Sequence, residues 1–123
     1  AVQLYELAAA QGHVIAQWRL GCCYQVGDGV EVNDATACRY YRIAAEQGYA
    51  LAQFSLALMT LKGMGVAQSD EAAVKWLRPA AAQGLPEALY ILGALYGDGC
   101  GGLPRDLNEA LRCFKRAAAL GSP

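Results

Sequence analysis

The sequence predicts an all-α solenoid of about three and a half helix-turn-helix repeats of 36 residues. Two observations lead to this prediction: glycines recur at nearly equal spacing, and the segments between them align column by column. The boundary glycines lie 36, 36 and 37 residues apart, at Gly12, Gly48, Gly84 and Gly121. We therefore expect a single domain over residues 1–123, with a half repeat at 1–11 and full repeats at 12–47, 48–83 and 84–120.

The aligned columns hold the same kinds of residue in each unit. The first half carries Ala and Leu four residues apart, then a small residue, then Tyr or Thr, and then Gly-x-Gly. These columns are Ala16/Ala52/Ala88, Leu20/Leu56/Leu92, Gly21/Ala57/Gly93, Tyr24/Thr60/Tyr96 and Gly27/Gly63/Gly99. The second half ends in paired alanines at 44–45, 80–81 and 117–118. One extra glycine near Gly101–Gly102 brings Leu103 into the column of Val30 and Val66.

The first helix of each unit is predicted from about Ile15 to Val26 and over the equivalent later residues. Small and apolar side chains recur there at i, i+4, i+5 and i+8, which is typical of one face of a helix. The Gly-x-Gly ends the helix, because helix C-caps commonly need a left-handed residue and glycine adopts that conformation without strain. Small residues in the Gly21 column are expected to let neighbouring helices approach closely.

The second helix of each unit is predicted to begin after Asn33, Ser69 or Asp106, which are all good N-cap residues. Asp106 and Glu109 also have the spacing of a capping box. This helix ends at the next boundary glycine. A proline inside the helix of the second unit predicts a kink near Lys75–Pro79, because proline lacks the backbone N–H that an interior helix position uses.

These columns resemble the Sel1-like repeat, whose pattern runs Ala-x-x-x-Leu-Gly-x-x-Tyr-x-x-Gly-x-Gly-Val, then a capping residue, Ala, an aromatic residue, Ala-Ala and Gly. The resemblance covers essentially the whole chain; Ala57 and Thr60 replace the usual Gly and Tyr in the second unit. The related tetratricopeptide repeat has a shorter unit of about 34 residues and lacks the glycine-rich loop. The resemblance implies a right-handed α/α superhelix whose first helices line the concave side.

The candidate binding surface is a stripe of residues on the first helices. By analogy with tetratricopeptide repeats, positions i, i+3 and i+7 of each first helix face the groove, and Ala94 ends the third column. We call the other eight residues the first-helix stripe: Ile15, Trp18, Cys22, Leu51, Phe54, Leu58, Glu87 and Tyr90. An aromatic ladder within the stripe suits a peptide or helix ligand, because aromatic side chains are enriched in binding hot spots. The alternative is that these rings pack between the repeats.

The predicted function is that of a non-catalytic scaffold or adaptor that binds a protein or peptide and needs no cofactor. A formal net charge of −1 does not favour nucleic acid or an anionic membrane surface as a partner. Apolar runs are too short to predict membrane insertion, which takes about 20 residues. Two alternatives remain: a hydrolase-like activity, as in disulfide-rich relatives, and RNA binding by helical repeats. A surface of apolar columns counts against RNA.

The cysteines do not follow the pattern of the disulfide-rich relatives. Those proteins carry cysteines seven residues apart across the turn between units, and alanines fill these columns here, namely Ala9/Ala16, Ala45/Ala52 and Ala81/Ala88. The sequence has no Cys-x-x-Cys, and its only histidine is His13, so zinc ligand spacing is missing. We expect buried, reduced thiols, which favour a reducing, cytoplasmic compartment, and a surface turn at His13.

Two further patterns bear on function. The string Gly97-x-Gly99-x-x-Gly102 matches a dinucleotide fingerprint by letter, but it follows a predicted helix instead of a strand, so a turn is the better interpretation. Leu111 and Phe114 leave the last helix apolar where a solenoid normally ends in a polar cap. The sequence therefore predicts either a fragment of a longer array or self-association through exposed repeat ends.

Overall fold

The computed structural model describes residues 2–99 and 105–121, and this part of the chain is entirely helical apart from its connections. The helices are α1 (Val2–Ala10), α2 (Val14–Val26), α3 (Asp34–Glu46), α4 (Ala50–Lys62), α5 (Asp70–Ala82), α6 (Pro86–Asp98) and α7 (Leu107–Gly121). They confirm the predicted all-α repeat superhelix. The extra glycine expected near Gly101–Gly102, with Cys100 and Leu103, lies outside the described residues.

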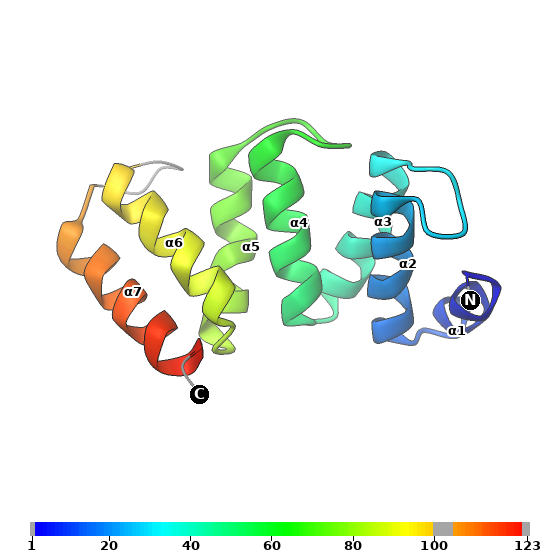
Figure 1. Cartoon of the computed structure of the whole chain (residues 1–123), viewed down its shortest axis with the longest axis horizontal. Coiled ribbons are helices and arrows are strands. Elements are labelled where there is room, and N and C mark those ends of the chain that lie inside the picture. The colour runs from blue at the N-terminus through cyan, green and yellow to red at the C-terminus, as the bar shows by residue number, and fades with distance from the viewer. Residues whose placement is uncertain (1, 100–104, 122–123) are drawn as a thin grey trace.

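The helices form a single curved row of pairs, with the two ends of the chain at opposite ends of the row (Figure 1). Within each unit the first helix packs on the second: α2 on α3, α4 on α5 and α6 on α7. Successive units meet where α3 packs on α4 and α5 packs on α6. The half unit α1 packs on α2 in the same way. Each interior unit therefore has one neighbour on either side, as in other solenoids.

The three predicted N-caps are confirmed. The side chains of Asn33, Ser69 and Asp106 each accept a hydrogen bond from the backbone N–H three residues further on, at 3.0–3.1 Å. Each bond satisfies one of the N–H groups that a helix leaves unpaired at its start. The first helices end as expected, since Gly27 and Gly63 adopt left-handed conformations with φ of +80° and +68°.

The cap residues also tie the two helices of a unit together. The backbone N–H of Asp106 donates to the carbonyl of Tyr96 at 3.0 Å, and the caps of the two earlier units make the same bond to the equivalent carbonyls. This bond makes the capping-box prediction wrong in its second half, because the N–H that Glu109 was expected to satisfy is already bonded. The Glu109 carboxylate pairs instead with Arg112, at 3.3 Å.

Proline does not divide the second helix of the middle unit. Helix α5 continues through Pro79 to Ala82, and the carbonyl of Pro79 accepts the backbone N–H of Gln83 at 3.2 Å. Pro79 lies in the last turn of the helix, where few residues remain that would have to change direction. The bend near Lys75–Pro79 stays a prediction.

The core consists of apolar contacts between successive units. Tyr41 of α3 and Leu56 of α4 are fully buried in one cluster, and Leu77 of α5 packs with α6 in the next. The Gly21 column brings the helices close, as predicted: a Cβ atom added at Gly21 would lie 2.5 Å from Cε1 of the Tyr41 ring. Alanine fills the same column in the middle unit, where Ala57 is fully buried.

Candidate functional site

The first-helix stripe divides into exposed and half-buried members. Ile15, Glu87 and Tyr90 are exposed. The other five are half-buried, namely Trp18, Cys22, Leu51, Phe54 and Leu58. Every member of the stripe therefore has some surface exposed, but five of the eight are also partly covered by other residues of the protein.

The aromatic column of the stripe packs on the following unit wherever one is present. The indole Nε1 of Trp18 donates to Oγ of Ser55 at 3.1 Å, and the Trp18 ring meets that of Tyr49 edge-on with centroids 5.8 Å apart. Phe54 is likewise packed against the core that α6 completes. Trp18 and Phe54 thus contribute to the contacts between units, as the alternative interpretation expected, and keep part of their surface exposed.

Tyr90 is the member of this column that stays most open. The residue is 60% exposed, and its ring packs against Phe114 of α7. The two ring centroids lie 5.3 Å apart at an angle of 54°. Such a tilted arrangement is favourable for aromatic pairs.

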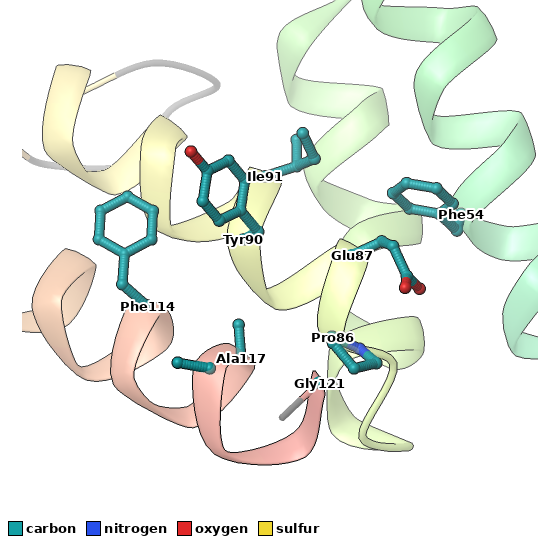
Figure 2. A pocket seen from close by; sticks show the side chains of 9 residues that line it. Phe54, Pro86, Glu87, Tyr90, Ile91, Phe114, Ala117 and Gly121 are labelled. Atoms are coloured by element: carbon teal, nitrogen blue, oxygen red, sulfur yellow. The ribbon is translucent and has the colours of Figure 1, made fainter. Parts of the chain in front are cut away.

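An apolar groove of about 660 Å³ lies beside this ring pair, and we call it the α6–α7 groove. Figure 2 shows Tyr90 and Phe114 next to each other over α6 and α7, with Phe54 of α4 beyond Glu87. The lining includes Phe54, Glu87, Tyr90, Ile91, Phe114 and Ala118. Its volume falls within the range typical of ligand pockets, about 300–1,000 Å³. The structure therefore brings three members of the stripe, Phe54, Glu87 and Tyr90, to one groove.

The remaining stripe residues near the N-terminal end line different hollows. Trp18 and Cys22 border a small hollow of about 160 Å³ beside Tyr5. Ile15 borders a shallower one of about 390 Å³, which also contains the exposed His13. These three stripe residues thus lie at hollows separate from the α6–α7 groove.

The contribution of α7 to the groove was missed by the sequence interpretation. Phe114 and Ala118 line it although both belong to a second helix, and only first-helix positions were assigned to the groove. The signal was present in the columns. Phe114 lies 37 residues after Leu77, and Leu77 lies 36 after Tyr41, so all three occupy one position that meets the following unit.

The buried cysteines have thiol pKa values raised above the ordinary value. The four cysteines in the described ranges are free thiols, three of them buried. Burial raises the pKa of the Cys38 and Cys113 thiols, and the negative charges of nearby Asp34 and Glu109, respectively, raise them further. The Cys38 thiol donates to the carbonyl of Met64 at 3.2 Å. Such thiols are protonated at neutral pH and are poor nucleophiles.

The part of the chain that the structure describes was compared with the requirements of a metal site and of a membrane span. Over residues 2–99 and 105–121, His, Cys, Asp and Glu side chains form no group of three or more that could hold a metal ion. Among the helices described, none is both long and apolar enough to cross a bilayer.

The comparison with protein families decides the assignment. The Sel1 repeat model matches residues 1–13, 14–49, 50–85 and 86–122. The chain belongs to the Sel1 repeat family. This confirms the resemblance inferred from the alanine, leucine and glycine columns. Sel1 repeats are generally protein–protein interaction modules and are typically non-catalytic.

Solved Sel1 repeat structures resemble this chain closely. A Sel1 repeat protein from Oxalobacter formigenes is 35% identical with a TM-score of 0.91, over 98% of this chain and 49% of that one. A protective antigen of uropathogenic Escherichia coli strains, which displays this repeat fold, is 36% identical with a TM-score of 0.93, over 96% of this chain and 25% of that one. The Sel1 repeat chain thus spans about half the length of the Oxalobacter formigenes protein and about a quarter of the length of the Escherichia coli antigen.

A more distant structure shares the fold alone. Helicobacter pylori cysteine rich protein B is 20% identical with a TM-score of 0.74, over 95% of this chain and 90% of that one. No curated protein matches the sequence significantly.

Proposed function

We propose that this Sel1 repeat chain is a non-catalytic scaffold or adaptor that binds a protein or peptide through the first-helix stripe. The observation that carries the proposal is Tyr90, a tyrosine 60% exposed at the edge of an apolar groove of about 660 Å³. Large exposed apolar surface is unfavourable in water unless a partner covers it. An exposed tyrosine beside such a groove is well suited to anchor a ligand.

The chemistry of the groove favours an apolar ligand with a small polar component. Phe54, Ile91 and Phe114 supply apolar walls, and the exposed Glu87 carboxylate lies at the edge. The phenol of Tyr90 offers a hydrogen-bonding group next to these walls. Because the rings of Tyr90 and Phe114 already pack on each other, binding would order few side chains and would lose little conformational entropy.

A peptide-display selection against the immobilised full chain tests this proposal. Selected peptides are rebound to the unmodified chain and to Tyr90→Ser, Ile15→Ser and Ile43→Ser variants. Ile43 is a matched control, since it is exposed like Ile15 but lies on the second helix α3. We expect Tyr90→Ser or Ile15→Ser to weaken binding at least about tenfold and Ile43→Ser to leave it within about twofold.

The salt dependence of binding gives an independent check. Contacts with apolar walls change little between low and physiological salt, whereas binding to phosphates weakens steeply as salt rises. Equal binding by the unmodified chain and both stripe variants would contradict the proposal. A steep loss of peptide binding with salt would instead indicate that ionic contacts, and not the apolar walls, hold the ligand.

A further inference from the structure

Glu87 is the only charged residue of the first-helix stripe. The same position in the two earlier first helices holds the apolar residues Ile15 and Leu51. Glu87 is exposed, and among the described residues that line the α6–α7 groove it is the only one with a charge. The acidic group thus belongs to the unit whose groove contains Tyr90 and Phe114.

The carboxylate of Glu87 has no cationic partner within the described part of the chain. The one ion pair in residues 2–99 and 105–121 joins Arg112 and Glu109. Glu87 lies in the first turn of α6, where a negative charge is favourable because the backbone N–H groups of that turn have no carbonyl partners within the helix. This position gives a local reason for an acidic residue and leaves its side chain exposed beside the groove.

Three aromatic rings line the same groove. The rings of Tyr90 and Phe114 pack on each other with centroids 5.3 Å apart, and Phe54 contributes a third ring from α4. Figure 2 shows Glu87 between Phe54 and Tyr90, with its carboxylate on the side of Phe54. The groove therefore offers ring surfaces to an apolar stem and a carboxylate to the group at the end of that stem.

This combination of groups favours a basic side chain as the ligand. Lysine and arginine have an apolar stem with a cationic end, and they commonly bury the stem while the charge stays in water. An acidic group would be repelled by Glu87. A wholly apolar ligand that covered Glu87 would remove water from the carboxylate and leave it without a partner, which is costly. A cationic end group replaces that water with a charge-assisted hydrogen bond, and a ring beside it adds a favourable cation–π contact.

We propose that the α6–α7 groove binds a lysine or arginine side chain of a partner peptide, with its stem on Tyr90 and Phe114 and its charged end at Glu87. The assignment rests on the proposed function, since the first-helix stripe holds the peptide, and it adds which side chain enters this groove. Because Glu87 is exposed, salt partly screens the ion pair, which adds only a shallow salt dependence to the binding.

The test uses the peptides obtained by display selection against the full chain. We expect the peptides whose binding is weakened by Tyr90→Ser to share a lysine or arginine. Synthetic versions replace that residue by an uncharged analogue of similar shape, which is norleucine for lysine and citrulline for arginine. Calorimetric titration of the unmodified chain is expected to show at least about fivefold weaker binding of the uncharged version.

Variants of the chain then locate the charged end of the ligand. Glu87→Gln keeps the shape of the side chain and is expected to reduce the preference for the basic residue to about twofold or less. Asp98→Asn, at the opposite end of α6 and outside the groove, removes the same charge and is expected to leave the preference unchanged. Tyr90→Leu is expected to weaken both versions by similar factors, because the ring holds the stem. Glu87, Tyr90 and Asp98 are exposed, so these replacements do not disturb the core.

Three results would overturn the proposal: Tyr90-dependent peptides that bind equally well with the uncharged analogue, a preference for the basic residue that survives Glu87→Gln, or peptides that depend on Ile15 alone. In each case the proposed function stands, because the peptides still bind through the stripe. A selection that yields no peptide sensitive to Tyr90→Ser or Ile15→Ser would instead contradict the proposed function, and the assignment of a basic side chain with it.

Discussion

Helices α5 and α7 occupy the same place in successive units, yet the protein surrounds them differently. Leu77 of α5 is fully buried because α6 packs over it, while Phe114, one unit later, keeps part of its ring exposed. The comparison teaches that burial of a second helix in this fold is supplied by the next unit along the chain. A second helix rich in apolar residues can therefore expose them to solvent when no following unit packs against it.

The largest difference between the two helices is expected in the free energy of unfolding, when one leucine on each helix is replaced by alanine. Leu77→Ala opens a cavity in a fully enclosed site and is expected to lower the free energy of unfolding by about 2–5 kcal/mol. Leu111→Ala removes an exposed side chain and is expected to change it by less than about 1 kcal/mol. Urea denaturation measures both. Equal losses would mean that the α7 face is covered in solution.

The second-largest effect is expected from replacing the helix glycines Gly21 and Gly93 by alanine, where helices pack closely in the first and last units. An alanine at Gly21 meets the ring of Tyr41, which is buried and cannot move aside, so the free energy of unfolding is expected to fall by about 1–3 kcal/mol. At Gly93 the added Cβ lies 3.0 Å from Cβ of Cys113 and 3.1 Å from Phe114, whose ring can shift towards the open groove. Thermal unfolding of both variants tests the order: a larger loss at Gly93 would contradict it.

The glutamine pair of the middle unit can be compared with the leucine pair of the last. Gln83→Leu leaves Oε1 of Gln53 without the amide that now donates to it at 3.0 Å, and about 1–3 kcal/mol of stability is expected to be lost. Changing both residues to leucine reproduces the arrangement of Leu89 and Leu120 and is expected to recover most of the loss. A double-mutant cycle in urea measures the coupling, and simple additivity would argue against it.

The smallest effect is expected in how stability depends on pH. Tyr41 can lose a proton, whereas Phe114, in the same column of the last unit, cannot. Burial raises the pKa of Tyr41 above its ordinary value of 10.0 and that of Cys38 above 9.0, so folding favours the protonated forms. Their contribution is complete below the ordinary values and is lost as pH rises from these towards the raised values. The unfolding free energy is expected to fall as pH rises from about 9 to about 11, and less so in Tyr41→Phe. No difference between the two proteins would refute this assignment.

Much of the fold could be predicted from sequence because the determining signals are local and repeated. The left-handed glycines and the caps at Asn33, Ser69 and Asp106 act within a few residues, and repetition of each signal makes the pattern unambiguous. The capping box failed because a carbonyl ten residues earlier, at Tyr96, competes for the same N–H. Spacing along one helix does not reveal such a competitor.

The candidate site was less predictable because it depends on contacts between units. Trp18, Phe54 and Tyr90 share one column, but Trp18 bonds to Ser55 of the next unit while Tyr90 stays open. Phe114 entered the groove from a second helix, which an analogy based on first helices did not consider. Column identity predicts which residue meets a neighbour, and only the arrangement in space shows whether that neighbour is there.

The bonds from the cap residues to the preceding helix have a consequence for how such chains change over evolution. The bond from Asn33 to Tyr24, like that from Asp106 to Tyr96, begins and ends within one unit. A duplication or deletion of one whole unit therefore carries its loop closure with it and breaks none of these bonds elsewhere. Recombination in steps of 36 residues can lengthen or shorten the array while each loop keeps its shape.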